Sequence, residues 1–98
     1  MPRLYAVFGT RGPAWRDGVA MEEQAEWRGH ADFMNALEAE GFVLLGGPLE
    51  GTRDVLLVVR AESPAEILDR FAADPWARQG LLAVPRVKPW TLRLGSLA

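Results

Sequence analysis

Residues 26–37 read EWRGHADFMNAL and contain the only histidine of the 98-residue chain. Within this stretch, residues recur at the helical spacing i, i+3, i+4, i+7 and i+10, namely Trp27, His30, Ala31, Met34 and Leu37. The spacing predicts an α-helix with one apolar face. His30 lies in the middle of that face, where an imidazole needs a hydrogen-bond partner or a cavity, because an unpaired buried polar group costs free energy.

We expect this helix to run from about Glu22 to Glu40. Acidic residues crowd its expected first turn, where they would interact favourably with the helix dipole, and Gly41 follows as a C-terminal stop. Gly29 costs about 1 kcal/mol inside a helix relative to alanine. It therefore indicates either a kink or a close approach of another element beside His30.

Four short apolar segments predict strands, at residues 4–8, 42–45, 54–60 and 81–87. The centre of the third segment, residues 55–59, does not alternate, which predicts burial on both faces. Pro85 cannot donate to a ladder, so the fourth strand is expected at an edge or with a bulge.

The second strand is followed by Gly46-Gly47-Pro48, which we expect to end the strand and to let the backbone approach another group closely. The segment from Gly9 to Met21 is rich in glycine and is predicted to be a long loop. It is either a mobile crossing loop or a lid over a pocket.

A second helix is predicted after Ser63, because Ser63, Pro64 and Glu66 form a capping box. Asp74-Pro75 then breaks this helix and starts a further turn that ends at Gly80. We expect Trp15 and Trp76 to form pocket walls, with the backbone of Gly47 and Pro48 contacting a ligand.

The predicted order is β-α-β-β-α-β, the split βαβ of a ferredoxin-like α+β fold with an antiparallel sheet. We expect one domain over residues 1–98, with its core in residues 3–90 and a short tail in 91–98. Both helices would cover one face of the sheet. The central third strand also needs cover on its other face, so we expect a homodimer through the sheet faces, with the C-terminal tail as the alternative cover.

The composition excludes several classes of protein. The formal charge is −2, from 11 basic and 13 acidic residues, and no block of like charge predicts a nucleic-acid or membrane partner. There is no cysteine, so disulfides and thiolate chemistry are excluded, and no metal site is expected with one histidine. The apolar run at residues 4–8 is too short for a signal peptide, and we expect a cytoplasmic protein.

Several short motifs appear in a telling order: Gly29-His30, Gly46-Gly47-Pro48, Asp74-Pro75-Trp76 and Lys88-Pro89-Trp90. In these the chain resembles the YCII-related family, small proteins that form dimeric α+β barrels. The resemblance implies His30 and Asp74 as a catalytic pair acting on small hydroxylated aromatic rings. Ala31 follows the histidine where the family usually has a larger aliphatic residue, which implies a larger pocket.

Histidine suits general acid–base chemistry, because its unperturbed pKa of about 6.5 lies near neutrality. A carboxylate such as Asp74 would fix its tautomer. The expected reaction is an isomerisation or elimination without a cofactor. One alternative is a ligand-binding or structural dimer without chemistry, in which Asp74 only caps a helix and His30 is a core histidine. Another is a monooxygenase of the same fold that needs only oxygen.

Overall fold

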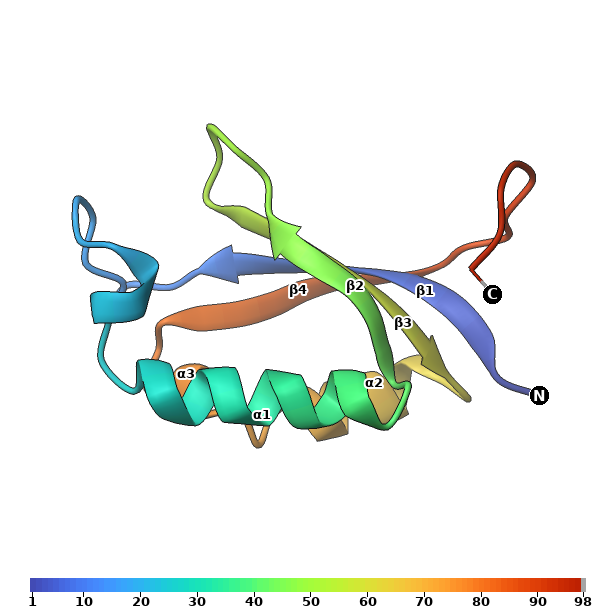
Figure 1. Cartoon of the computed structure of the whole chain (residues 1–98), viewed down its shortest axis with the longest axis horizontal. Helices are drawn as coiled ribbons and strands as arrows, with labels where there is room; N and C mark the ends of the chain where they lie inside the picture. Colours follow the sequence, from blue (N-terminus) through green and yellow to red (C-terminus); the bar gives the residue numbers. More distant parts are fainter. Residues whose placement is uncertain (98) are drawn as a thin grey trace.

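A four-stranded antiparallel sheet carries every helix on one face (Figure 1). The computed structural model describes residues 1–97, with only the backbone at Pro85. The elements are β1 (Arg3–Arg11), the 3₁₀ turn η1 (Met21–Glu23), α1 (Trp27–Ala39), β2 (Val43–Pro48), β3 (Asp54–Ala61), α2 (Pro64–Phe71), α3 (Pro75–Arg78) and β4 (Leu82–Pro89). The strand order β2-β3-β1-β4 confirms the predicted ferredoxin-like fold.

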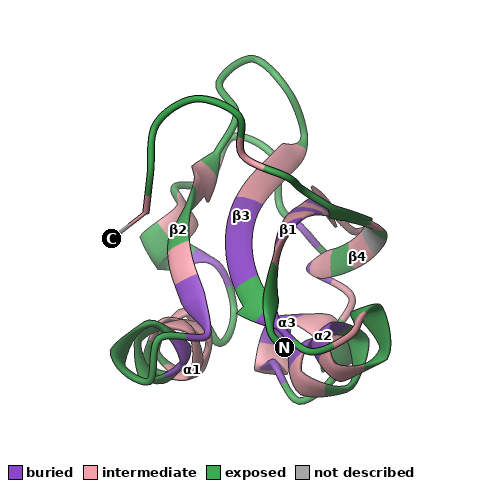
Figure 2. Ribbon diagram, turned by 90° about the vertical axis from the view of Figure 1, so that its right-hand side faces the viewer, coloured by how far each residue is buried: buried purple, intermediate pink, exposed green. Residues whose placement is uncertain are grey.

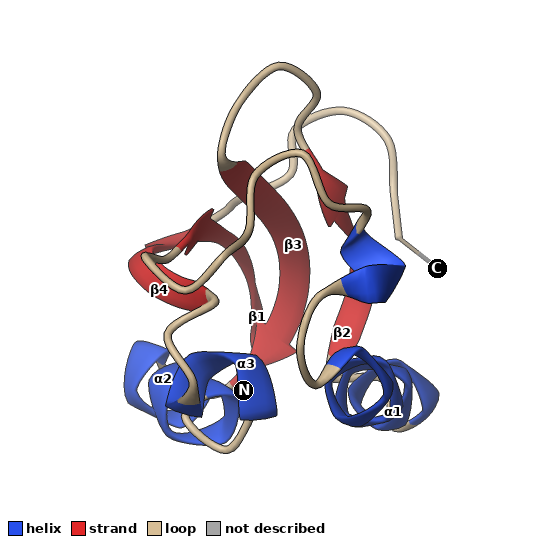
Figure 3. Ribbon diagram, turned by 90° about the vertical axis from the view of Figure 1, so that its left-hand side faces the viewer, coloured by secondary structure: helices blue, strands red, loops and turns tan. Residues whose placement is uncertain are grey.

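The core lies between the sheet and the helices, because alternate strand residues point to the helical face. Tyr5 and Val7 of β1 are 3% and 0% exposed, and they cluster with Leu37 of α1 and with Ile67 and Phe71 of α2. Figure 3 shows α1 and the α2–α3 pair side by side beneath the sheet. The described residues contain no helix that is both long enough and apolar enough to cross a bilayer.

Strand β3 is central and buried, as its unbroken apolar sequence predicted (Figure 2). Val58 points away from the helices and is still only 6% exposed. In the single chain the C-terminal segment supplies part of its cover, because the half-buried Leu92 and Leu97 line one hollow with Val58 and Leu45. The C-terminal tail is the alternative to a second copy as cover for the outer face of β3. The burial of Val58 alone therefore does not require a second copy. Ala98, the last residue of the predicted tail, lies outside the described residues.

The predicted start of the first helix at Glu22 is wrong, because α1 begins at Trp27. Residues 21–23 form only the turn η1, and the first turn of α1 has no acidic residue. The chain reverses at Glu26, which adopts the left-handed conformation with φ 59°. The C-terminal stop is correct, since Gly41 has φ 80° directly after the helix.

The prediction that Gly46-Gly47-Pro48 ends the second strand is also wrong. These residues continue β2, pairing with Leu57, Leu56 and Val55 of β3. Because β2 is an edge strand, a proline can stand there without breaking the ladder on the inner side. A Cβ added at Gly46 would lie 2.3 Å from a methyl carbon of Leu57, so glycine leaves room for that side chain.

Strand β4 is the other edge strand, as the proline within it predicted. Its register with β1 shifts between Phe8 and Thr10, opposite the segment that holds Pro85. The strand runs from Leu82 to Pro89, which is further than predicted. Strand β1 is longer too, ending at Arg11, so the connecting loop is shorter than the sequence suggested.

Candidate functional site

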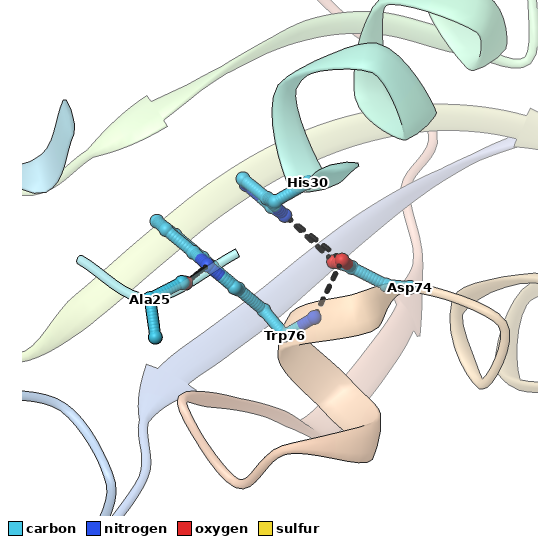
Figure 4. A network of polar contacts seen from close by, with 4 residues as sticks. All are labelled: Ala25, His30, Asp74 and Trp76. Carbon is cyan, nitrogen blue, oxygen red and sulfur yellow. Dashed lines mark hydrogen bonds and ion pairs between the residues drawn. The ribbon is translucent and has the colours of Figure 1, made fainter. Parts of the chain in front are cut away.

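His30 and Asp74 meet where α1 lies against α3 (Figure 4). The imidazole Nδ1 lies 3.0 Å from Oδ1 and 2.9 Å from Oδ2 of Asp74, and the two side chains are 12% and 4% exposed. An ionised carboxylate can only accept hydrogen bonds, so the tautomer that fits this contact has its hydrogen on Nδ1, and Nδ1–H donates a hydrogen bond to Asp74. The other ring nitrogen, Nε2, makes no hydrogen bond to a described residue and is free for a ligand.

The start of α3 positions the Asp74 carboxylate. Asp74 is the N-cap of this helix, where its Oδ1 accepts a hydrogen bond from the Trp76 backbone N–H at 3.0 Å, and Pro75 occupies the first turn. The predicted capping role is therefore present. Because a carboxylate has two oxygens with about four lone pairs, it serves the helix and the imidazole together.

Trp76 supports the imidazole from one side. Its ring stacks on His30 with 3.8 Å between centroids and 5° between planes. Its Nε1–H donates to the carbonyl of Ala25 at 2.7 Å, which ties the segment before α1 to α3. Trp15 packs edge-on against Trp76 at 5.3 Å, and Trp27 tilts against it at 5.9 Å. His30 thus has little freedom to rotate away from Asp74.

A cavity of about 440 Å³ opens beside His30, between α1 and the inner face of the sheet. Small-molecule sites usually have volumes of about 300–1,000 Å³. The wall is mostly apolar, with residues such as Met34, Leu57 and Val84. A small ring compound would therefore fit with its apolar surface buried and with Nε2 of His30 within reach.

Most of the predicted site residues gather around this cavity, which is lined by His30, Gly47, Pro48, Asp74 and Trp76. Trp15 is the exception. It was expected as a pocket wall, but it is 8% exposed behind Trp76 and does not line the cavity. Its ring packs at 89° to that of Trp76, and the Arg11 guanidinium lies over its face at 4.4 Å.

Sequence analysis missed two polar lining residues, Asn35 and Glu38, which are exposed on α1. Glu38 lies eight positions after His30, so the helical spacing that identified Met34 would have reached it. Both are exposed polar residues, so the apolar pattern of the helix does not point to them. No three described His, Cys, Asp or Glu side chains cluster as metal ligands would.

The loop between β1 and α1 is held down by its own side chains. Gln24 is 4% exposed and bonds three backbone groups: its Oε1 accepts from Arg16 N–H, and its Nε2 donates to the carbonyls of Arg16 and Val19. Met21, which belongs to η1, is the part of this segment that lines the cavity, and the role of residues 12–20 as a lid stays a prediction.

Comparisons with known proteins agree with this architecture. The family model of the YCII-related domain matches residues 4–91. A solved structure of 5-chloro-2-hydroxyhydroquinone dehydrochlorinase from Burkholderia phenoliruptrix AC1100, in complex with 2,5-dihydroxybenzoquinone, superposes with a TM-score of 0.63. It is 20% identical in sequence, over 94% of this chain and 95% of that one. No curated protein matches the chain.

Proposed function

The chain belongs to the YCII-related family, and from this membership we propose that it is a small enzyme using His30 as a general acid–base on a hydroxylated aromatic ring. The single observation that supports the proposal most is the Asp74 carboxylate on Nδ1 of His30 at the wall of an apolar cavity. That arrangement leaves Nε2 as the only ring nitrogen available to a substrate.

The surroundings suit a proton transfer at Nε2. When Nε2 takes a proton, the Asp74 carboxylate would stabilise the imidazolium, as in other carboxylate–histidine pairs. The face of the Trp76 ring, stacked at 3.8 Å, would add a cation–π contribution. General acid–base catalysis of this kind contributes about 10²–10⁴-fold to a rate.

We propose isomerisation or elimination as the reaction class, with the dehydrochlorinase neighbour as a guide to the probe. In loss of HCl from 5-chloro-2-hydroxyhydroquinone, the carbon bearing chlorine gains a proton and two hydroxyl protons leave. The C–Cl bond breaks with its electron pair on chloride, so the ring becomes a quinone and no external oxidant is needed. Each proton step is one that a histidine can mediate.

The test is anaerobic chloride release from 5-chloro-2-hydroxyhydroquinone. We expect turnover by the wild type and a loss in kcat/KM of about 10²–10⁴-fold for His30→Gln. Asp74→Asn should also lose activity, because an amide nitrogen facing Nδ1 would favour the wrong imidazole tautomer. Asp69→Asn makes the same chemical change on the exposed side of α2 and should leave the rate unchanged.

Two outcomes would contradict the proposal. A wild-type protein that releases no chloride contradicts the elimination, and an unchanged rate in His30→Gln contradicts the role of His30. Turnover that appears only when oxygen is admitted would instead favour the monooxygenase alternative.

A second candidate function is a ligand-binding or structural protein without chemistry. It is favoured by the cap that Asp74 supplies to α3 and by the stack of His30 on Trp76, since both stabilise the fold whatever else they do. In this case His30→Gln would lower the melting temperature while leaving the affinity for ring compounds unchanged.

We also propose that two copies pair through the outer faces of their sheets. Apolar side chains remain accessible there, including Leu45, which is 56% exposed. The tail presents Trp90 and Leu94 to solvent with exposures of 42% and 91%. A second sheet stacked on this face would bury them.

A further inference from the structure

The cavity beside His30 contains carboxylates but no cation. Its polar side chains among the described residues are His30, Asn35, Glu38 and Asp74, and no lysine or arginine lines it. Arg11 packs on the ring of Trp15, and neither of those residues lines the cavity. The site therefore has no fixed positive group with which to pair an anionic ligand.

A protonated His30 would not offer an unpaired positive charge to such a ligand. Its Nδ1 is held between the two oxygens of Asp74 at 3.0 and 2.9 Å, so any positive charge on the ring already faces a carboxylate. An anionic ligand at Nε2 would therefore interact with an imidazolium that is already paired with the Asp74 carboxylate. The negative charge of Asp74, which is 3% exposed, is also poorly screened by water.

Glu38 places a second carboxylate further along the same wall. It follows His30 by eight residues on α1, or about 12 Å along the helix axis at 1.5 Å per residue. It lines the cavity and makes no ion pair with a described residue. A ligand lying along α1 would thus meet a carboxylate at either end, with the apolar Met34 between them.

We propose that this site selects uncharged hydroxylated rings and rejects rings that carry a carboxylate, and that Glu38 is a determinant of this selectivity. The inference rests on the proposed function for its ligand class. A carboxylate brought into the cavity would lose its hydration without gaining a counter-ion, and both acidic side chains would repel it. The hydroxyl groups of a neutral ring can instead bond His30 and Asn35.

Matched ligand pairs test the inference by binding alone. Hydroquinone and 2,5-dihydroxybenzoate differ only in one carboxylate, as do catechol and 3,4-dihydroxybenzoate. Each is titrated anaerobically into the wild-type protein, with the NMR signals of His30, the only histidine, as the reporter. We expect the neutral member of each pair to bind at least about tenfold more tightly.

Glu38→Lys should narrow that ratio by about threefold or more, mainly by strengthening the binding of the carboxylated member. Asp69→Lys makes the same change in net charge on α2, outside the cavity wall, and should leave the ratio unchanged.

Three results would overturn the inference: equal or tighter binding of the carboxylated rings, no binding of either pair at millimolar concentration, or the same ratio in Glu38→Lys as in the wild type. Failure of the proposed chemistry is a separate outcome. Undiminished turnover in His30→Gln would remove the catalytic role of His30 and leave the binding ratio standing.

Discussion

At the scale of single residues, Gly29 sets how closely α1 and α3 approach beside the imidazole. A Cβ at this position would lie 3.2 Å from Cγ of Pro75 and 3.2 Å from Oε2 of Glu26. Pro75 follows the Asp74 cap directly, so its ring cannot move far without disturbing the carboxylate that holds His30. Of the two explanations that the sequence left open, the structure favours the close approach.

Gly29→Ala should therefore fail to stabilise the helix. On propensity alone the change would add about 1 kcal/mol to the free energy of unfolding, but overpacking against Pro75 typically costs about 1–3 kcal/mol. We expect a net loss of about 1 kcal/mol in urea denaturation. The reverse change at an open site of the same helix, Ala36→Gly, should cost about 1 kcal/mol by propensity.

A double variant shows whether Pro75 is the cause. Pro75→Ala removes the nearest ring atom, so the cost of Gly29→Ala should be smaller in that background. Equal costs in both backgrounds would mean that the contact with Pro75 is irrelevant.

Glu26 carries local backbone strain at the entry to α1. Its φ of 59° lies in the left-handed region, which costs a residue with a Cβ about 1–2 kcal/mol. Glu26→Gly should therefore raise the free energy of unfolding by about 1 kcal/mol. Glu26→Val should lower it, because a branched side chain tolerates this conformation least. Thermal melts of the two variants decide the matter, and a lower melting temperature for Glu26→Gly would contradict the strain argument.

At the scale of elements, the boundaries of α1 show where local sequence signals stop being sufficient. The acidic residues Glu22 and Glu23 predicted a helix start, but they belong to η1. The Gln24 side chain forms hydrogen bonds with three backbone groups of the loop, and the carbonyl of Ala25 accepts a hydrogen bond from the indole N–H of Trp76. These partners lie 5, 8 and 51 residues away along the chain, so the charge pattern at Glu22 and Glu23 could not have revealed them.

The candidate site was more accessible to sequence reasoning than the helix boundary. His30 was predicted because it is a polar residue on an apolar helix face. Asp74 was predicted from its N-cap motif together with the family resemblance. Gly47 and Pro48 were predicted to lie near a ligand, and both line the cavity. That they belong to a strand was not predicted, because proline is tolerated only in an edge strand and the sequence alone does not show that β2 is one. The position of Trp15 depended on the packing of three indole rings and was not predictable.

The ends of α1 and α2 are linked by an ion pair between Glu40 and Arg70, with Oε2 and Nη2 2.6 Å apart. The hydrogen bond from Arg70 holds the pKa of Glu40 below its ordinary value of 4.5, against partial desolvation, which raises it. The pKa of Glu40 is lower in the folded state than in the unfolded state. The ion pair therefore stabilises the fold fully when the pH is above the pKa of Glu40 in the unfolded state. That contribution disappears as pH falls through the folded pKa.

Glu40→Gln should therefore lower the melting temperature slightly at neutral pH. The difference in melting temperature between the variant and the wild type should disappear as the pH falls below the ordinary pKa range of carboxyl groups. Asp69→Asn, an exposed carboxylate with no ion pair among the described residues, serves as the control and should show no such trend. A gap that stays constant from neutral to acidic pH would mean that the ion pair does not stabilise the fold.

At the scale of the whole molecule, the outer face of the sheet decides whether the chain functions alone. Strand β3 alternates its side chains between the two faces, so Leu56 and Val58 both point away from the helices. The tail hollow includes Val58 but not Leu56. The tail therefore covers only part of this apolar face, and a second copy would complete the cover.

We expect the wild type to have twice the chain mass in light scattering at micromolar concentration, and Leu56→Arg to have the mass of a single chain. A charge on the outer face would be buried without a partner in the dimer, at a cost of several kcal/mol. Leu68→Arg places the same charge at an exposed leucine of α2, on the opposite side of the sheet, and should remain dimeric.

The monomeric variant should still unfold cooperatively, because the inner core from Tyr5 to Phe71 is untouched and the tail still lies over Val58. A monomeric wild type, or a Leu56→Arg variant that stays dimeric, would show that the outer face is not the interface.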